Sequence, residues 1–436
     1  MLKGNKVIKN AGWILFGKIL QSVFGIIVTM LTTRYFGPSN YGIINYATAI
    51  VSFVTPIAQL GLNSTIVHEI INSEEDKECK ILGTAIIMNI LSSLLCIFGI
   101  FVFVSFANKG DIISIIICVL YSISLLFQSL ELIQYWFQAK LLSKYSSIVM
   151  FIAYAITAAY KIILLLFGQN LYLYAISNSL DYAIISIVLI LIYRKMTGNK
   201  LKFSYQLIKP LLKNSKYYII SGLMVTIFAQ TDKIMIKLMV GDEATGLYSA
   251  ATAMVGLTTF IFTAFINSAM PDILEKKKNN DKAGYERTLT LLYSIVIYLA
   301  IFQSIIITIF PSFFVKILYG DDYLPCVNTL VIVVWYTAFS YVGAVRDIWL
   351  LAEKKQRYLV TINAFGAFLN LTLNYFLISK YEIVGAAIAT LITQISTNVV
   401  IGFILKPIRP NNRLLLKSLN PVVIINVLRK PKTTRP

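Results

Sequence analysis

Twelve apolar stretches of about 20 residues limit the folds open to this chain more than any other feature of its sequence. An α-helix of that length rises far enough to cross the ~30 Å hydrocarbon core of a bilayer. Only 14% of the 436 residues are charged, 57% are hydrophobic, and the mean hydropathy is +0.74. The sequence therefore predicts an all-α polytopic membrane protein, with transmembrane helices near residues 11–33, 41–61, 81–106, 112–137, 147–167, 171–193, 217–239, 247–270, 288–310, 329–351, 358–379 and 383–405.

The net charge of +19 is distributed as membrane topology requires, not as a nucleic-acid surface. If the N-terminus is cytoplasmic, loops assigned to the inside hold 30 Lys and Arg residues, and loops assigned to the outside hold four: Arg34, Lys109, Lys316 and Lys380. Cytoplasmic loops retain such residues during insertion. This bias predicts cytoplasmic termini and an even number of spans, with the loop cations contacting anionic lipids.

An internal repeat divides the chain into two similar parts. Placing residue n over residue n+204 aligns residues 9–57 without a gap, and eleven of the 49 pairs are identical, among them Gly37 with Gly241 and Gly42 with Gly246. Six spans on each side predict two bundles in the same orientation, a parallel repeat. The predicted domains are an N-terminal bundle at 1–193, a cytoplasmic linker at 194–216, a C-terminal bundle at 217–405 and a basic cytoplasmic tail at 406–436. A purely structural duplication stays an alternative.

Five cations lie within the predicted spans, where an unpaired charge near the centre costs roughly 2.5–3.5 kcal/mol on insertion scales. Gly222, Thr226, Gln230, Lys233 and Lys237 form one helical stripe, and Lys18, Ser22, Ile26, Thr29 and Thr33 occupy the matching face of the first span. Two such stripes are expected to line opposite walls of one cavity. The predicted cationic substrate site consists of Lys18, Lys161, Lys233, Lys237 and Arg346.

Four acids also lie within the spans: Glu131, Asp181, Asp232 and Asp347. The three aspartates are candidate ion-coupling residues, because an intramembrane carboxylate can exchange a counter-ion for a proton or Na⁺. Lys237 and Glu131 lie near span ends, where their side chains could instead reach the interface. The adjacent pairs Asp232–Lys233 and Arg346–Asp347 could compensate each other locally, although helical neighbours point about 100° apart and pair poorly.

Signals for catalysis or metal binding are weak. The four cysteines have no CxxC spacing, which indicates neither a disulfide framework nor a metal site. His68 is the only histidine and is expected at an interface. Asp321-Asp322 could belong to a metal-dependent glycosyltransferase or polymerase, but a short loop favours a solvated turn. The sequence predicts no catalytic residue, no bound metal and no cofactor other than a coupling H⁺ or Na⁺.

Three segments carry a family resemblance. They are "RYFGPSNYG" at 34–42, with "GLNSTIVHEI" from Gly61; "YWFQAKLLSKY" at 135–145; and Asp232-Lys233 with Gly241 and Gly246-x-Tyr248. Together they resemble the Wzx-type polysaccharide repeat-unit flippases, of O-antigen or capsule synthesis, within the multidrug/oligosaccharidyl-lipid/polysaccharide exporter (MOP) superfamily. His68 departs from the family pattern, in which this position is often basic, so no role is transferred to it.

The resemblance implies a non-enzymatic flippase in a bacterial plasma membrane. Such a protein moves undecaprenyl-diphosphate-linked oligosaccharide from the inner to the outer leaflet by alternating access of two bundles. Its partners would include membrane lipids and possible polymerase and chain-length proteins. A cation-coupled multidrug exporter of the same fold is the first alternative, although five intramembrane cations against four acids favour an anionic substrate. A membrane glycosyltransferase or polymerase is the second, and the sequence lacks the large outer loop that it needs.

Overall fold

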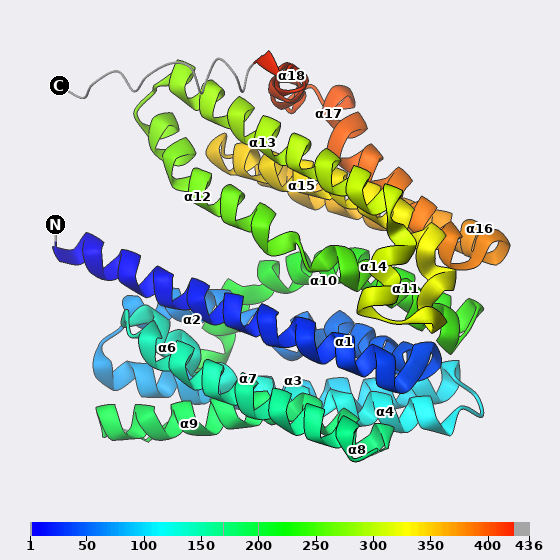
Figure 1. Ribbon diagram of the computed structural model, residues 1–436. Helices are drawn as coiled ribbons and strands as arrows, with labels where there is room; N and C mark the ends of the chain where they lie inside the picture. Colours follow the sequence, from blue (N-terminus) through cyan, green and yellow to red (C-terminus); the bar gives the residue numbers. More distant parts are fainter. Residues whose placement is uncertain (1, 169, 199, 423–436) are drawn as a thin grey trace. The chain divides into compact units, whose positions relative to one another are not determined.

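The computed structural model describes residues 2–168, 170–198 and 200–422, and in this part of the chain it contains helices and short connections but no strand (Figure 1). Contacts divide the chain into two compact units, unit 1 at Met1–Gly246 and unit 2 at Leu247–Pro436. Unit 1 contains α1 Leu2–Ala58, α2 Leu62–Ile71, α3 Glu75–Ala107, α4 Ile112–Ser122, α5 Ser124–Glu131, α6 Gln134–Ala139, α7 Ser143–Leu166, α8 Leu171–Ile176, the 3₁₀ turn Ser177–Ser179, α9 Leu180–Thr197, the 3₁₀ turn Tyr205–Leu207 and α10 Ile208–Met239.

Helix α11, Asp242–Gly256, crosses the boundary between the units. Unit 2 continues with α12 Thr259–Lys278, α13 Lys282–Ile309, α14 Pro311–Leu318, the 3₁₀ segment Asp321–Cys326, α15 Val327–Ala352, α16 Arg357–Ile395, the π-helical turn Ser396–Val400, α17 Ile401–Ile404 and α18 Arg409–Ser418. The predicted domain boundary at 194–216 stays a prediction, as do the two six-helix bundles on either side of it.

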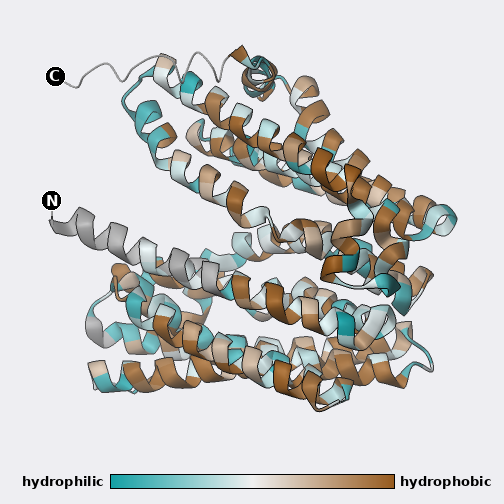
Figure 2. Ribbon diagram, viewed as in Figure 1, coloured by the Kyte–Doolittle hydropathy of each residue, from teal (hydrophilic) through white to brown (hydrophobic). Residues whose placement is uncertain are grey.

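Long apolar helices dominate both units (Figure 2). Within the described residues, nine helices are long and apolar enough to cross a membrane, or ten when the bent pair α11 and α12 counts as one span. Large apolar side chains remain exposed on them, such as Leu95 at 73% and Phe368 at 72%. A soluble surface rarely carries so many, so these faces are suited to lipid. The helical polytopic class is confirmed, and the count of twelve spans stays a prediction.

Breaks at equivalent repeat positions interrupt the chain in unit 1. Gly37, inside α1, has φ +69°, and Gly241, between α10 and α11, has φ +126°. Glycine reaches positive φ without the steric cost of a Cβ atom. The identity of these two residues in the repeat therefore corresponds to a shared backbone requirement, the change of direction after a long helix.

The second pair of repeated glycines makes a reciprocal contact. A Cβ atom on Gly42 would overlap the carbonyl of Asp242, and a Cβ atom on Gly246 would overlap the carbonyl of Pro38. Adding 204 to 38 and 42 gives 242 and 246, so each contact is the repeat equivalent of the other. Only glycine permits this approach of the two backbones.

Unit 1 has two apolar cores. One packs α1 residues 43–58 against α3, α4, α5 and α8, and includes Tyr46, Tyr121 and Tyr174. The other surrounds Trp136 and Phe137 with side chains of α2, α3, α7 and α9. The connection after α9 is held against α3, because Lys202 N donates to the Cys79 carbonyl (3.1 Å) and Ser204 N donates to Thr84 Oγ1 (2.9 Å).

Unit 2 packs α12, α13, α15 and α16 around a core that includes Tyr293, Trp349 and Leu415. Part of the predicted tail forms α18, which packs on α13. The predicted solvated turn at Asp321-Asp322 lies in the 3₁₀ segment, where Asp321 pairs with Lys316 at 2.9 Å. Residues 423–436 of the predicted tail lie outside the described residues.

Candidate functional site

A polar cavity of about 300 Å³ lies inside unit 1 between α1, α4, α7, α8 and α9. We call it the Lys161 cavity, because Lys161 of α7 is the one cation among its lining residues. Asp181, at the start of α9, also lines this cavity and interacts electrostatically with Lys161. The cavity is otherwise lined largely by hydroxyl, amide and phenol groups, including those of Thr29, Asn45 and Asn178.

The Lys161 ammonium is held beside an aromatic ring. Its nitrogen lies 5.4 Å from the ring centre of Tyr174, a cation–π distance. Tyr174 is fixed in turn, because its hydroxyl lies 2.6 Å from Thr32 Oγ1 on α1. A partly buried cation positioned this way can meet an anionic ligand without first leaving a tight ion pair.

A second cavity of about 590 Å³ shares Thr48, Tyr121 and Asn178 with the first and is therefore adjacent to it. Its amides form a chain, in which Gln59 Nε2 donates to Gln128 (3.0 Å) and Asn63 Nδ2 donates to Gln59 (2.5 Å). Hydroxyl and amide groups both donate and accept hydrogen bonds, so together these walls match the hydroxyl-rich surface of a sugar.

Glu131, whose side chain could also reach the interface on the sequence evidence alone, belongs to this region. It is only 9% exposed at the end of α5, and its carboxyl interacts electrostatically with Asp181. Both acids also interact with Tyr154, which lines the Lys161 cavity. The sequence suggests that a span ends near Glu131. In the structure, α4, α5 and α6 together form one interrupted helical segment that continues past Glu131, so the residue is buried instead.

Lys237 lies apart from the cavity, in an ion-pair cluster at the far end of α10. Its ammonium donates to Asp111 Oδ2 (2.8 Å), Ser114 Oγ (3.0 Å) and Asp242 Oδ1, and it lies 5.7 Å from the ring centre of Tyr46. The residue is 8% exposed. All three ammonium protons thus have partners within the protein, and Lys237 joins the α3–α4 connection to the start of α11.

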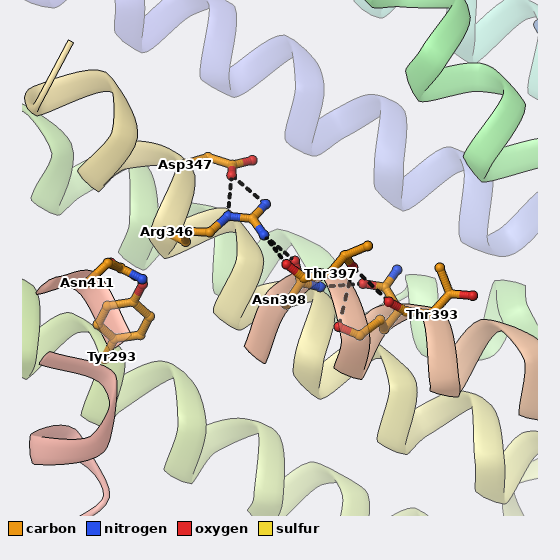
Figure 3. Close-up of polar contacts among 8 residues, drawn as sticks. Tyr293, Arg346, Asp347, Thr393, Thr397, Asn398 and Asn411 are labelled. Carbon is orange, nitrogen blue, oxygen red and sulfur yellow. Dashed lines mark hydrogen bonds and ion pairs between the residues drawn. The ribbon is translucent and has the colours of Figure 1, made fainter. Parts of the chain in front are cut away.

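Arg346 is engaged inside unit 2 (Figure 3). It is 4% exposed, and its Nη1 donates to the Thr397 carbonyl (2.7 Å) and to Asn398 Oδ1 (2.9 Å) on the π-helical turn. Its Nη2 and Nε donate to Asp347 Oδ1 at 2.8 and 3.1 Å. The sequence leaves local compensation between these two neighbours open, although adjacent helical residues point about 100° apart. In the structure the two do pair, because the long guanidinium side chain bends back to a carboxylate that is 47% exposed.

The remaining predicted residues are not gathered in one place. Asp232 is buried and Lys233 half-buried on α10, and the two interact electrostatically, but neither lines the cavities of unit 1 described above. The Lys18 side chain lies outside the described residues. The two predicted stripes also differ from expectation, because Thr29 lines the Lys161 cavity whereas Gly222 and Thr226 line its neighbour. Of the predicted set, the structure brings together Lys161 and Asp181.

A family model described as polysaccharide biosynthesis protein matches residues 7–275, more than half of the chain. The chain belongs to this polysaccharide biosynthesis protein family. The chain is similar to the capsular polysaccharide biosynthesis protein CapF of Staphylococcus aureus, 21% identical over 89% of this chain and 96% of that protein's length. A probable low-salt glycan biosynthesis flippase of Haloferax volcanii is 24% identical over 43% of this chain and 42% of its own length.

Similar solved structures show which fold this chain adopts. A lipid II flippase MurJ in an inward closed conformation matches with a TM-score of 0.72 at 16% identity, covering 98% of this chain and 94% of the other. An inward-facing multidrug resistance MATE transporter of the MOP superfamily matches with a TM-score of 0.69 at 11% identity, covering 91% and 96%. This polysaccharide biosynthesis protein therefore has the fold of MOP-superfamily transporters, as the sequence resemblance predicts.

Proposed function

We propose that this membrane protein is a flippase for lipid-linked oligosaccharides in surface polysaccharide synthesis. Its substrate would be an undecaprenyl-diphosphate-linked repeat unit, moved from the inner to the outer leaflet of the bacterial plasma membrane by alternating access. Membership of the polysaccharide biosynthesis family supports a role in surface polysaccharide synthesis. The transporter fold supports translocation of the substrate in preference to catalysis on it. The observation that carries the proposal is the Lys161 cavity with its larger neighbour, since a cation and many hydroxyl and amide groups suit a phosphorylated sugar.

Lys161 would contact the anionic part of the substrate. Lysine serves as a point charge for phosphate, and burial strengthens that attraction relative to water. The hydroxyl and amide walls would contact sugar hydroxyls, which need hydrogen-bond partners once they leave water. Lys18, Lys233, Lys237 and Arg346 stay predictions as further substrate contacts; Lys237 and Arg346 would first have to exchange the partners described above.

A coupling ion would act at Asp181. This carboxyl faces the same cavity as Lys161 and lies near Glu131, so a proton or Na⁺ bound there would change the charge that the substrate meets. Asp232 and Asp347 stay candidates from their positions in the sequence. Asp181 in the cavity also favours one alternative function, a cation-coupled multidrug exporter, because a carboxylate in a cavity attracts cationic drugs.

Complementation of a flippase-null strain tests the cavity. Lys161→Ala should lower the rate of transport about ten- to hundredfold, because a hydrogen bond to a charged group contributes about 1.5–3 kcal/mol. Lipid-linked repeat units should accumulate, and Lys161→Arg should keep part of the activity. Asp181→Asn should make transport insensitive to collapse of the proton and sodium gradients, or abolish it.

Lys195→Ala is the matched control, because Lys195 is exposed at the end of α9 in the same unit. Normal surface polysaccharide from Lys161→Ala at normal protein level would reject the assignment of this site. Efflux of a cationic dye by the wild-type chain, with no complementation of the flippase-null strain, would favour the drug exporter.

A further inference from the structure

A polar pocket of about 610 Å³ lies in unit 2, between the α12–α13 connection, the end of α15 and helix α18. We call it the α18 pocket. Its charged lining is predominantly basic, with three acids, Asp281, Glu286 and Glu353, and six cations: Lys276, Lys277, Lys282, Lys355, Arg413 and Lys417. It lies in a different unit from the Lys161 cavity, and the proposed transport mechanism does not use it.

Half of these cations are already engaged by the protein. Lys277 pairs with Glu353 at 2.6 Å, and Glu353 also accepts from Tyr285 (3.1 Å). Lys355 Nζ donates to the Pro407 carbonyl (2.8 Å) and lies 4.7 Å from the ring centre of Trp349. Lys276 pairs with Asp272 at 2.6 Å. These contacts build the walls of the pocket and fix the start of α18.

Asp281 is also used locally, since its Oδ1 accepts from Gly284 N (2.9 Å) at the start of α13. That leaves Lys282, Arg413 and Lys417 as the cations directed to the pocket without such a contact. Among the described residues, none of the three has a carboxylate oxygen within 4.0 Å. Arg413 and Lys417 are four residues apart on α18, so they share one face of that helix.

The position of α18 indicates a membrane lipid and not a soluble ligand. The helix runs across α13, the direction expected of a helix lying in the membrane plane (Figure 1). Tyr293 Oη donates to Asn411 (2.9 Å) and Ser294 Oγ to the Ser418 carbonyl (2.9 Å), which fixes α18 against α13. Beside its cations, Leu416 is 52% exposed, an apolar side chain next to the charged groups.

We propose that the α18 pocket binds the phosphate group of an anionic membrane lipid through Lys282, Arg413 and Lys417. The guanidinium of Arg413 supplies a planar pair of donors and the two ammonium groups supply point charges, a combination that suits phosphate oxygens. The acyl chains of the lipid would lie beside Leu416 and Leu419, the exposed apolar side chains near the end of α18. Bound lipid would hold α18 on α13 and so stabilise the end of the last long helix.

Native mass spectrometry of the full chain in neutral detergent tests this site with three probes: phosphatidylglycerol, phosphatidylcholine and inorganic pyrophosphate. Phosphatidylglycerol should bind at least about tenfold more tightly than phosphatidylcholine, because three cations favour a net negative headgroup. The triple variant Lys282→Gln, Arg413→Gln, Lys417→Gln should remove most of that preference.

The matched control is Lys278→Gln, Arg287→Gln, Lys406→Gln, which removes two lysines and one arginine that are exposed but do not line the pocket. The control should keep the preference within about twofold of wild type. Equal loss in both triple variants would overturn the proposal in favour of nonspecific surface charge. Pyrophosphate bound as tightly as phosphatidylglycerol would overturn the assignment to a lipid. Size-exclusion profiles of both variants show whether each is folded.

Discussion

At the scale of single residues, Lys237 shows how a costly intramembrane charge can be neutralised without a ligand. Its partners Asp111 and Asp242 come from the α3–α4 connection and the start of α11, and Ser114 of α4 completes the set. Removing the ammonium would leave two carboxylates facing each other near a half-buried surface. Breaking a buried pair by deleting one partner typically costs about 3–5 kcal/mol.

Asp111 gives this cluster a defined pH dependence. Partial burial alone would raise the pKa of its carboxyl, but the hydrogen bonds from Lys237 and Ser114 outweigh burial and hold the pKa below 3.8. A lowered pKa in the folded state contributes stability above the unfolded pKa, and that stability is lost as the pH falls through the folded pKa. We expect Asp111→Asn to lose about 1 kcal/mol at pH 7, because the carboxyl is a third exposed.

Scanning fluorimetry between pH 7 and pH 3 measures this effect. The difference in Tm between wild type and Asp111→Asn should shrink as the pH drops below about 3.8. Glu74→Gln, an exposed acid in the same unit, should show little difference at any pH. A Tm difference for Asp111→Asn that persists unchanged to pH 3 would contradict the ion-pair explanation.

At the scale of helices, the reciprocal glycine contact makes a direct prediction. Gly42→Ala should destabilise unit 1 by about 1–3 kcal/mol or more, because the new methyl group meets the backbone carbonyl of Asp242, which cannot rotate away. Gly99→Ala is the control, since a Cβ there meets no atom within 4 Å. Fluorescence-detected size exclusion should show a smaller monodisperse peak for Gly42→Ala only; equal peaks would contradict the close approach.

The sequence predicts the helical class, because apolar length is a local property. The repeat also marks Gly37, Gly42, Gly241 and Gly246. It does not explain why Gly42 and Gly246 must be glycine, since the close approach to Asp242 and Pro38 is seen only when both segments are in place. Burial of Glu131 could not be predicted, because it depends on how α5 is broken from α4 and α6.

The predicted cation set illustrates the same limit. A charge within a span indicates that some partner is needed, yet hydropathy does not tell whether that partner is a ligand or the protein. The partners of Lys237 lie around the starts of α4 and α11, and Arg346 also binds a π-helical turn; periodicity does not reveal either arrangement. Lys161 lines a cavity with a tyrosine ring beside it. A search for spans does not mark helix α18, because its ten residues are too short to cross a membrane.

At the scale of the whole molecule, the charge bias predicts the orientation in the membrane. Reporter fusions after Lys200 and Lys278 should give cytoplasmic signals, and fusions at Asp242 and Asp322 should give outside signals, because the 30 inner and four outer loop cations set the orientation. Alkaline phosphatase and green fluorescent protein report the two sides with opposite signals. An outside signal at Lys278 would be incompatible with two similarly oriented bundles.

Gly42 lies against Asp242, and Gly246 lies against Pro38. This reciprocal pair has the form of an isologous contact, in which one patch meets its own copy around a two-fold axis. Two identical subunits pair in this way. A chain carrying a single copy of the repeat would leave the backbone at Gly42 uncovered until another molecule supplied the matching carbonyl. Because both halves of the contact lie in one polypeptide, the other residues of each segment can differ, as Pro38 and Asp242 do, while both glycines are the same.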